Sequence, residues 1–406
     1  MTILHIAPTP FFSDRGCHIR ILGELRALQE NGLNVVLTTY HLGKDAENVN
    51  IYRTIRIPWY NKISVGGSIH NLYMDFFLLI ESVKAVLKHK PSVIHGHLHE
   101  GALIAKFVSW LTSFGKTPVV FDVQGSLTGE LITHGVLRNS GFLNKLFLFL
   151  EKIICHLPNY VVCSSKSNYE FIINEMKVPA NRVSELIDGI YSNYFKDQNN
   201  DKLRKSLKIK NEKILIYSNS LLPSKGIKEF INAIPKILHN YNNVKVIIVG
   251  YPVANVKHMA EKLNIINSII FLGRVDFFYL LDYLSIADIA VDPKVDIAGE
   301  GSGKIINYMG AGLPIVCFDS QNNHNFLAEN GVFARSGDSD DLADKILSLL
   351  NDYKTADRLG RLNKERANEF FSWNVKGKDL IHIYNKIIRF QKLFFYFSPI
   401  ILPNLI

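Results

Sequence analysis

The sequence contains little cysteine. Its 406 residues include only four, and these are scattered without the paired spacing of a zinc site or a disulfide framework: Cys17, Cys155, Cys163 and Cys317. Their number and spacing exclude a fold held together by cross-links and favour a reducing compartment.

Long apolar runs are also missing. No stretch reaches about 18 uninterrupted apolar residues, because the richest ones carry prolines or charges such as Lys145 and Glu151. The amino terminus, MTILHIAPTPFF, lacks the basic start and longer apolar core of a signal peptide. We expect a soluble or peripheral protein in the cytoplasm or at the cytoplasmic face of the membrane.

The charge balance is basic, with a formal net charge of +9 and a pI near 9.1. No basic run has interleaved aromatic residues, and neither helix-turn-helix nor zinc-finger spacing is present, so nucleic acid is the least favoured partner. The positive charge instead favours a phosphorylated substrate or an anionic membrane. A content of 47% hydrophobic and 20% charged residues is typical of a globular enzyme with two or three domains.

Apolar runs rich in β-branched residues alternate with helical periodicity, which predicts α/β architecture with parallel sheets covered on both faces. The predicted strands of the first half are Ile3–Ala7, Val35–Thr39, Val93–His97, Val119–Val123 and Tyr160–Ser164. The pattern restarts after a polar stretch with Ile214–Ser218, Val244–Val249, Ile269–Leu272, Ile289–Asp292 and Ile315–Phe318.

The polar stretch from Lys196 to Lys213 predicts a linker, although one exposed helix within a single domain would have the same composition. We therefore expect an amino-terminal domain at 1–198, a carboxyl-terminal domain at 199–375 and a final helix with an apolar tail at 376–406. Ligands of open parallel sheets bind beyond the carboxyl ends of the strands, so the functional motifs should lie on the loops that follow them.

Three loops fit this expectation. Gly16 precedes a helical segment after the first strand, where free amide groups suit a phosphate or a sugar. Lys225 and Gly226 follow a strand and open a helix, where the lysine offers positive charge to a diphosphate, although a solvated lysine in a proline turn fits equally well.

The third loop is the most glycine-rich, with Gly299, Gly301 and Gly303 ahead of a helix that ends at Gly312-Leu313-Pro314. Ser302 can cap this helix, and Lys304 and Asn307 lie within its first turns, the place to hold a phosphate and a ribose. The spacing differs from both the Rossmann and the Walker phosphate-binding motifs.

Taken together, these motifs resemble the large retaining glycosyltransferase family of GT-B type often called family 4. The stretch NYMGAGLPIV from Asn307 to Val316 matches the family's EAMACG-x-PVV segment, and Lys225-Gly226 matches its PEKG-like turn. Further matches run in the family's order from residue 3 to about 388: Val93–His97, Ile187–Ile190, Leu272–Arg274, Ala287–Ile289, Gly331–Phe333, Gly337-Asp338 and Phe371–Trp373.

The resemblance implies two facing Rossmann-like domains with a final helix that crosses back to the first. The second domain would bind a UDP- or GDP-linked sugar, the first a glycan or lipid-linked acceptor in surface polysaccharide or glycoconjugate synthesis, and closure of the cleft would join them. The implied donor-binding residues are Gly16, Asn219, Ser220, Lys225, Arg274, Ser302, Gly303, Lys304 and Asn307, with Lys225, Glu300 and Gln124 as catalytic residues. No metal and no resident cofactor are expected.

Some positions depart from the family pattern. Asn307 stands where the family has a ribose-binding glutamate, Ser220 aligns with an arginine, and Glu300 is one position from the usual spacing of the first glutamate. Gln124 replaces a histidine close to the reacting sugar and cannot exchange a proton near neutral pH. These departures leave open a catalytically inactive homologue that acts as a binding or assembly subunit.

Polar residues after two strands of the first half predict an acceptor pocket formed by His97, Asp122, Ser126 and Glu130, although structural roles suit some of them equally well. His95, His97 and His99 alternate as metal ligands on one side of a strand would, but the resemblance implies no metal. A NAD-dependent dehydrogenase would need GxGxxG after the first strand, and Pro8–Cys17 does not contain it.

The tail from Arg389 to Ile406 is apolar and aromatic, with two basic residues. It predicts either contact with a membrane interface or packing against the first domain, and its prolines predict that it forms no long helix.

Overall fold

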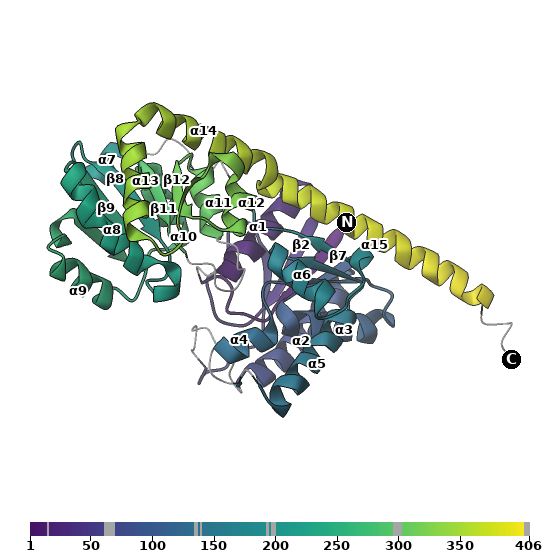
Figure 1. The fold of residues 1–406 in the computed structure, drawn as a ribbon. Helices are drawn as coiled ribbons and strands as arrows, with labels where there is room; N and C mark the ends of the chain where they lie inside the picture. Colours follow the sequence, from purple (N-terminus) through teal and green to yellow (C-terminus); the bar gives the residue numbers. More distant parts are fainter. Residues whose placement is uncertain are drawn as a thin grey trace. The chain divides into compact units, whose positions relative to one another are not determined.

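The computed structural model describes residues 1–13, 16–60, 70–133, 137–138, 140–191, 195, 200–294 and 303–401. The chain forms two compact units (Figure 1). One comprises Met1–Asp188 together with Trp373–Ile406, and the other comprises Gly189–Ser372. Within the described helices, none is long and apolar enough to cross a bilayer.

The first unit contains a parallel sheet of seven strands in the order β3-β2-β1-β4-β5-β6-β7. Its strands are β1 (Thr2–Ala7), β2 (Asn34–Thr39), β3 (Asn50–Arg53), β4 (Val93–His97), β5 (Val119–Val123), β6 (Tyr160–Cys163) and β7 (Val183–Glu185). The order reverses direction between β1 and β4, and in such sheets the loops beside this point form the ligand site.

Helices cover both faces of this sheet: α1 (Gly16–Glu30), α2 (His70–His89), α3 (Leu98–Ser113), α4 (Leu127–Thr133), α5 (Phe142–His156), α6 (Lys166–Asn174) and α15 (Trp373–Ile401). Ile3 packs with residues of α1 and α15, whereas its neighbour Leu4 packs with residues of α2 and α3. Because successive strand residues point to opposite faces and both faces are covered, the strands between the two edges are largely apolar.

The second unit contains six parallel strands in the order β10-β9-β8-β11-β12-β13. These are β8 (Lys213–Ser218), β9 (Val244–Val249), β10 (Ile269–Gly273), β11 (Ile289–Asp292), β12 (Ile315–Phe318) and β13 (Val332–Ala334). The helices are α7 (Asn200–Ser206), α8 (Ile227–Asn240), α9 (Ala254–Lys262), α10 (Phe277–Ser285), α11 (Gly303–Gly310), α12 (Gln321–Leu327), α13 (Ser339–Asn351) and α14 (Tyr353–Phe370).

The polar stretch that predicts the linker contains α7, which belongs to the second unit. Asn200 donates a hydrogen bond to the carbonyl of Ser285, and Arg204 to that of Ile286, so α7 is tied to the end of α10. The chain passes from one unit to the other before this stretch, at Asp188 and Gly189.

Helix α15 packs against α1 of the first unit, as the family resemblance predicts. A Cβ atom at Gly23 would lie 2.0 Å from the ring of Trp373, and one at Gly377 would lie 3.0 Å from Ala27, so glycines permit the contact. The prediction that the tail forms no long helix is wrong, because α15 extends through Pro399 to Ile401. A proline in the last turn removes one hydrogen bond and leaves the preceding turns intact.

Candidate functional site

In the second unit, three loops meet at the carboxyl edge of the sheet, and glycines allow them to approach. Gly226, with φ of 72°, lies so close to the loop after β11 that a Cβ would come 1.7 Å from the carbonyl oxygen of Pro293. At Gly250, after β9, a Cβ would come 1.9 Å from the carbonyl oxygen of Asn219, after β8. No side chain fits at either contact, so the loops form one surface.

Lys225 lies on this surface. It is half-buried at the end of a single turn of 3-10 helix, Pro223–Lys225, directly before α8. The hydroxyl of Tyr217 lies 3.1 Å from the carbonyl oxygen of Ser220 and 3.2 Å from that of Lys225, and burial raises the pKa of this tyrosine. Tyr217 thus remains a neutral donor that holds the turn, while Asn219 accepts a hydrogen bond from the amide of Ser220 at 2.9 Å.

Helix α11 follows β11 at the same edge. The hydroxyl of Tyr308, fully buried, accepts a 2.8 Å hydrogen bond from the amide of Ser218 and anchors the helix to the end of β8. Lys304 and Asn307 are half-buried on the helix, one turn apart, and Gly303 is exposed at its first position.

Arg274 is exposed after β10, and its guanidinium lies 5.9 Å from the ring centre of Tyr251. The structure thus places Asn219, Ser220, Lys225, Arg274, Gly303, Lys304 and Asn307 at or beside the carboxyl edge of one sheet. Glu300 and Ser302 lie outside the described residues, so their roles stay predictions.

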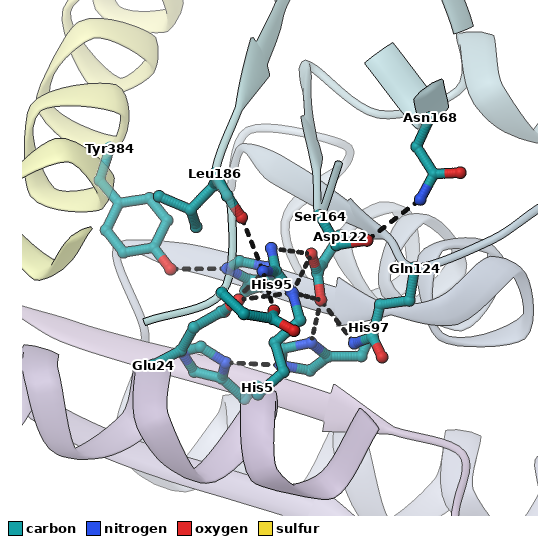
Figure 2. Close-up of polar contacts among 12 residues, drawn as sticks. His5, Glu24, His95, His97, Asp122, Gln124, Ser164, Asn168, Leu186 and Tyr384 are labelled. Carbon is teal, nitrogen blue, oxygen red and sulfur yellow. Dashed lines mark hydrogen bonds and ion pairs between the residues drawn. The ribbon is translucent and has the colours of Figure 1, made fainter. Parts of the chain in front are cut away.

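In the first unit, the corresponding edge contains a buried polar network that begins with two register pairs (Figure 2). His5 is the Cα partner of His95 across β1 and β4, and His97 is the partner of Asp122 across β4 and β5. His97 Nδ1 lies 2.9 Å from Asp122 Oδ2, and His97 Nε2 lies 2.9 Å from His5 Nδ1. Because an ionised carboxylate only accepts hydrogen bonds, His97 donates from Nδ1 to Asp122.

Arg20 supplies the positive charge of this network. Its guanidinium lies 2.6 Å from Asp122 Oδ1, 2.8 Å from Asp188 Oδ1 and 2.6 Å from the carbonyl oxygen of Leu186. Burial alone would raise the pKa of Asp122, but Arg20 and the hydrogen bond from His97 outweigh burial and hold that pKa well below its usual range. Asp122 is therefore an anion although it is fully buried.

Glu24 lies one helical turn after Arg20, and its carboxylate is 3.2 Å from the guanidinium. Burial, strengthened by the charge of Asp122, raises the pKa of Glu24 well above its usual value. His95 Nε2 lies 3.7 Å from Glu24, and its Nδ1 lies 2.6 Å from the hydroxyl of Tyr384 on α15. The network thus ties α15 to the sheet.

Glu24, His95, His97 and Asp122 present ligand atoms within 4.8 Å of one another, the spacing of a metal site. The guanidinium of Arg20 already occupies the neighbourhood of both carboxylates, so an ion there would be close to a fixed positive charge. His99 does not join this group as strand alternation predicts. Strand β4 ends at His97 and α3 begins at Leu98, which turns the Nε2 of His99 toward Glu151 at 3.3 Å.

Gln124 and Ser126 lie on the loop between β5 and α4. Gln124 is half-buried and donates a 2.7 Å hydrogen bond from its side-chain amide to Asp122 (Figure 2). Ser126 donates to Glu151 at 3.2 Å and accepts from the amide of Gly129, so its hydroxyl caps α4. Glu130 is exposed on α4, and Gly16 opens α1 with free space at its Cβ position.

His97 and Asp122 are fully buried, and of the loop residues predicted to bind the acceptor only Glu130 is exposed. The sequence does not predict that Arg20, Glu24 and Asp188 belong to this site. Arg20 and Glu24 are one helical turn apart, and they lie on the same side of α1 as the apolar residues Ile21 and Leu25. This shared side is the feature of the sequence that indicates their burial.

Two family models match the chain. The model described as Glycosyltransferase Family 4 matches residues 16–188, and the model described as Glycosyl transferases group 1 matches residues 199–366. Between them they span most of both units.

Among curated relatives, the capsular polysaccharide biosynthesis glycosyltransferase CapM of Staphylococcus aureus is 23% identical over 337 residues, covering 78% of this chain and 83% of CapM. A phosphatidyl-myo-inositol mannosyltransferase of Mycobacterium leprae is 26% identical over 168 residues, covering 41% of this chain and 44% of that protein.

The crystal structure of HepE from Anabaena in complex with UDP superposes on 95% of this chain and 100% of HepE, with a TM-score of 0.73 and 16% identity. At this identity the likeness shows the fold alone, two Rossmann-like domains of the GT-B type. With both sequence halves matched and the fold shared, the chain belongs to the group 1, family 4 glycosyltransferases.

Proposed function

We propose that this glycosyltransferase moves a sugar from a UDP- or GDP-linked donor to a glycan or lipid-linked acceptor, with retention of the anomeric configuration, in the synthesis of a surface polysaccharide or glycolipid. The proposal rests mainly on the position of Lys225. This residue lies on a turn whose Gly226 packs closely against the loop after β11. The name of CapM supports a polysaccharide product, and the UDP bound to HepE supports a nucleotide-linked donor.

In the proposed reaction, the bond between the anomeric carbon and the diphosphate oxygen breaks, and a bond from that carbon to the acceptor oxygen forms on the same face. The departing diphosphate takes the acceptor's proton, so no strong protein base is required, which suits a glutamine at position 124. Lys225, Arg274 and backbone amides would steady the negative charge that grows on the leaving group, without metal. Asn307 would hold the ribose through a neutral hydrogen bond.

The test is a panel of UDP- and GDP-sugars, with binding followed by calorimetry and turnover by release of nucleoside diphosphate in the presence and absence of EDTA. NMR of a transferred product reads the anomeric configuration. Turnover that survives EDTA and yields a retained product supports the proposal. Binding without turnover across glycan and lipid-linked acceptors would instead identify an inactive homologue, and binding of NAD alone would identify a dehydrogenase.

Lys225 provides the sharper test. Lys225→Ala should lower kcat by on the order of a hundredfold, as the loss of one charge-stabilising group does. Lys228→Ala, on an exposed lysine in the first turn of α8, is the matched control and should leave kcat unchanged. Equal kinetics for both variants would remove Lys225 from the mechanism.

We further propose that the first unit contacts an anionic membrane through α5 and α3, at the cytoplasmic face. Helix α5 buries Asn144, Glu151 and Cys155 and turns the opposite face outward. That face is apolar, with Phe142, Leu143, Leu146, Phe149, Leu150 and Ile153 all exposed. Such a face suits the interface of a bilayer.

Helix α3 packs against α5 and extends this apolar surface with Phe107, Trp110 and Leu111, and Phe114 directly follows the helix. The exposed Lys116, Lys145 and Lys152 on the same two helices and the turn after α3 add positive charge, which favours anionic headgroups. The relative named for mannosyl transfer to phosphatidyl-myo-inositol supports a lipid acceptor. The buried thiols of Cys155, Cys163 and Cys317, which form no disulfide, suit the reducing side of the membrane.

Sedimentation with vesicles of phosphatidylcholine, with and without phosphatidylglycerol, tests this contact. Phe149→Glu should lower the bound fraction severalfold on the anionic vesicles. Tyr353→Glu, on an aromatic residue of the second unit that is 68% exposed against 61% for Phe149, is the control and should bind as the unaltered chain does. Equal loss in both variants, or binding that ignores lipid charge, contradicts the proposed surface.

A further inference from the structure

The side-chain amide of Gln124 has a fixed direction. Its Nε2 donates to Oδ2 of Asp122 at 2.7 Å, and its carbonyl oxygen is turned away from that carboxylate (Figure 2). Gln124 is half-buried at the carboxyl end of β5, beside the point where the strand order reverses. It is thus the part of the buried network that comes closest to the surface along this loop.

The direction follows from the charge of Asp122. Arg20 donates to both oxygens of this carboxylate, from Nε at 3.0 and 3.1 Å and from a terminal nitrogen at 2.6 Å, and His97 lies 2.9 Å from Oδ2. A carboxylate held as an anion accepts hydrogen bonds and donates none. Only the nitrogen of the Gln124 amide can therefore face it, and a flipped amide would place two acceptors against each other.

The backbone that carries Gln124 is held from the other side by Glu151. This carboxylate on α5 accepts hydrogen bonds from the amides of Leu127 at 2.9 Å and Thr128 at 3.1 Å, and from the hydroxyl of Thr128 at 2.6 Å. Two buried anions, Asp122 before the loop and Glu151 behind it, thus fix the loop between β5 and α4.

We propose that Asp122 is a positioning residue that holds the Gln124 amide so that its carbonyl oxygen accepts a hydrogen bond from a hydroxyl of the sugar substrate. The inference rests on the proposed function, and it gives Asp122 an indirect role in place of the direct acceptor contact that its position in the sequence suggested. Gln124 binds the hydroxyl, and Asp122, charged through Arg20 and His97, sets which end of the amide the substrate meets.

Gln124→Glu tests the inference because the new carboxyl group has two states. When neutral, it can donate its O–H to Asp122 and keep a carbonyl oxygen where Gln124 has one. When ionised, it is repelled by Asp122 and loses that geometry. Two carboxylates this close raise the pKa of one of them, so the neutral form persists at weakly acidic pH.

The readout is kcat/KM for release of nucleoside diphosphate from UDP-glucose or GDP-mannose, whichever the unaltered enzyme turns over, between pH 5.5 and 8.5. The deficit of Gln124→Glu relative to the unaltered enzyme should be about tenfold or more at pH 8 and should shrink severalfold toward pH 5.5. Gln124→Ala should show a deficit that does not change with pH. Gln321→Glu, on an exposed glutamine of the second unit, should match the unaltered enzyme throughout.

A second variant assigns the effect to Asp122. When Asp122→Asn is combined with Gln124→Glu, the new amide can donate to the ionised carboxylate at position 124, so the pH dependence of the deficit should disappear. If the variant with Asp122→Asn does not fold, as judged by circular dichroism, the pH dependence of Gln124→Glu alone still tests the inference. A flat deficit for Gln124→Glu, or full activity for Gln124→Ala, overturns the inference. Failure of the unaltered enzyme to turn over any donor would overturn the proposed function instead.

Discussion

Replacement of Arg20 by methionine should destabilise the first unit in a way that depends on pH. Arg20 and Asp122 are 2% and 0% exposed, and the guanidinium also contacts Asp188 and Glu24. Removal of one partner from a buried ion pair typically costs about 3–5 kcal/mol because the other charge is left without compensation. For a unit of this size, that loss lowers the melting temperature by roughly 6–20 °C.

The sign of the pH effect follows from the pKa of Asp122. In the unaltered protein this pKa lies below its ordinary value, so the associated stability is present above about pH 4 and is lost as the pH falls. Without Arg20, burial dominates and raises the pKa of Asp122, so the folded variant prefers the protonated acid. The deficit of Arg20→Met should therefore be largest at pH 8 and smaller at pH 5.

Tryptophan fluorescence isolates this effect, because Trp59, Trp110 and Trp373, the three tryptophans of the chain, all belong to the first unit. Thermal melts at pH 5 and 8 give the two deficits. Arg335→Met is the control, since Arg335 is 76% exposed beside Asp338 and Asp341, and exposed pairs contribute little. A deficit for Arg20→Met that is independent of pH, or no larger than that of the control, would refute the reasoning.

Two further predictions concern the two units separately. Gly226→Ala should weaken donor binding at least tenfold in calorimetry, because the new Cβ would collide with Pro293. Gly337→Ala is the control and should leave donor binding unchanged, because Gly337 has a similar φ of 76° but open space around it. Equal effects of the two substitutions would contradict the contact. Asp75→Asn should melt at a higher temperature than the unaltered chain at pH 8 and at the same temperature at pH 4. Burial raises the pKa of Asp75 to about 7, so its ionisation lowers the stability of the fold as the pH rises from about 4 to 7. The side-chain amide of the introduced asparagine does not ionise and still accepts the hydrogen bond from Tyr40. A difference in melting temperature that stays constant across this pH range would contradict the prediction.

The ten strands expected from the sequence are all present, and nine of them are mainly buried and read as largely apolar runs. The tenth, β10, lies at a sheet edge and is mostly half-buried, but its apolar sequence still marks it. The strands that the pattern did not predict are β3, β7 and β13, which have three or four residues and lie at sheet edges. An edge strand is paired with a neighbour on one side only, through backbone hydrogen bonds. This pairing requires no particular pattern of apolar side chains, so the sequence gives little indication of the strand.

The candidate site also has a part that the sequence predicts and a part that it does not predict. The glycine turn at Lys225 and Gly226 is local, and turn chemistry predicts it. Arg20 and Asp122 are 102 residues apart, and a charged pair on an amphipathic helix usually faces solvent. The packing of α1 onto the sheet encloses this pair, and no local pattern specifies the partner of Arg20.

The position of α15 has a consequence for synthesis of the protein. On the ribosome, residues 189–372 are complete before Leu380, Ile383, Tyr384 and Ile387 exist, and these four side chains fill the core on the α1 face of the sheet. The second unit therefore has its complete sequence before the first unit does. Until α15 is synthesised, the first unit has an uncovered apolar surface on the α1 face of its sheet. A premature stop codon near the end would spare the second unit and leave the first incomplete.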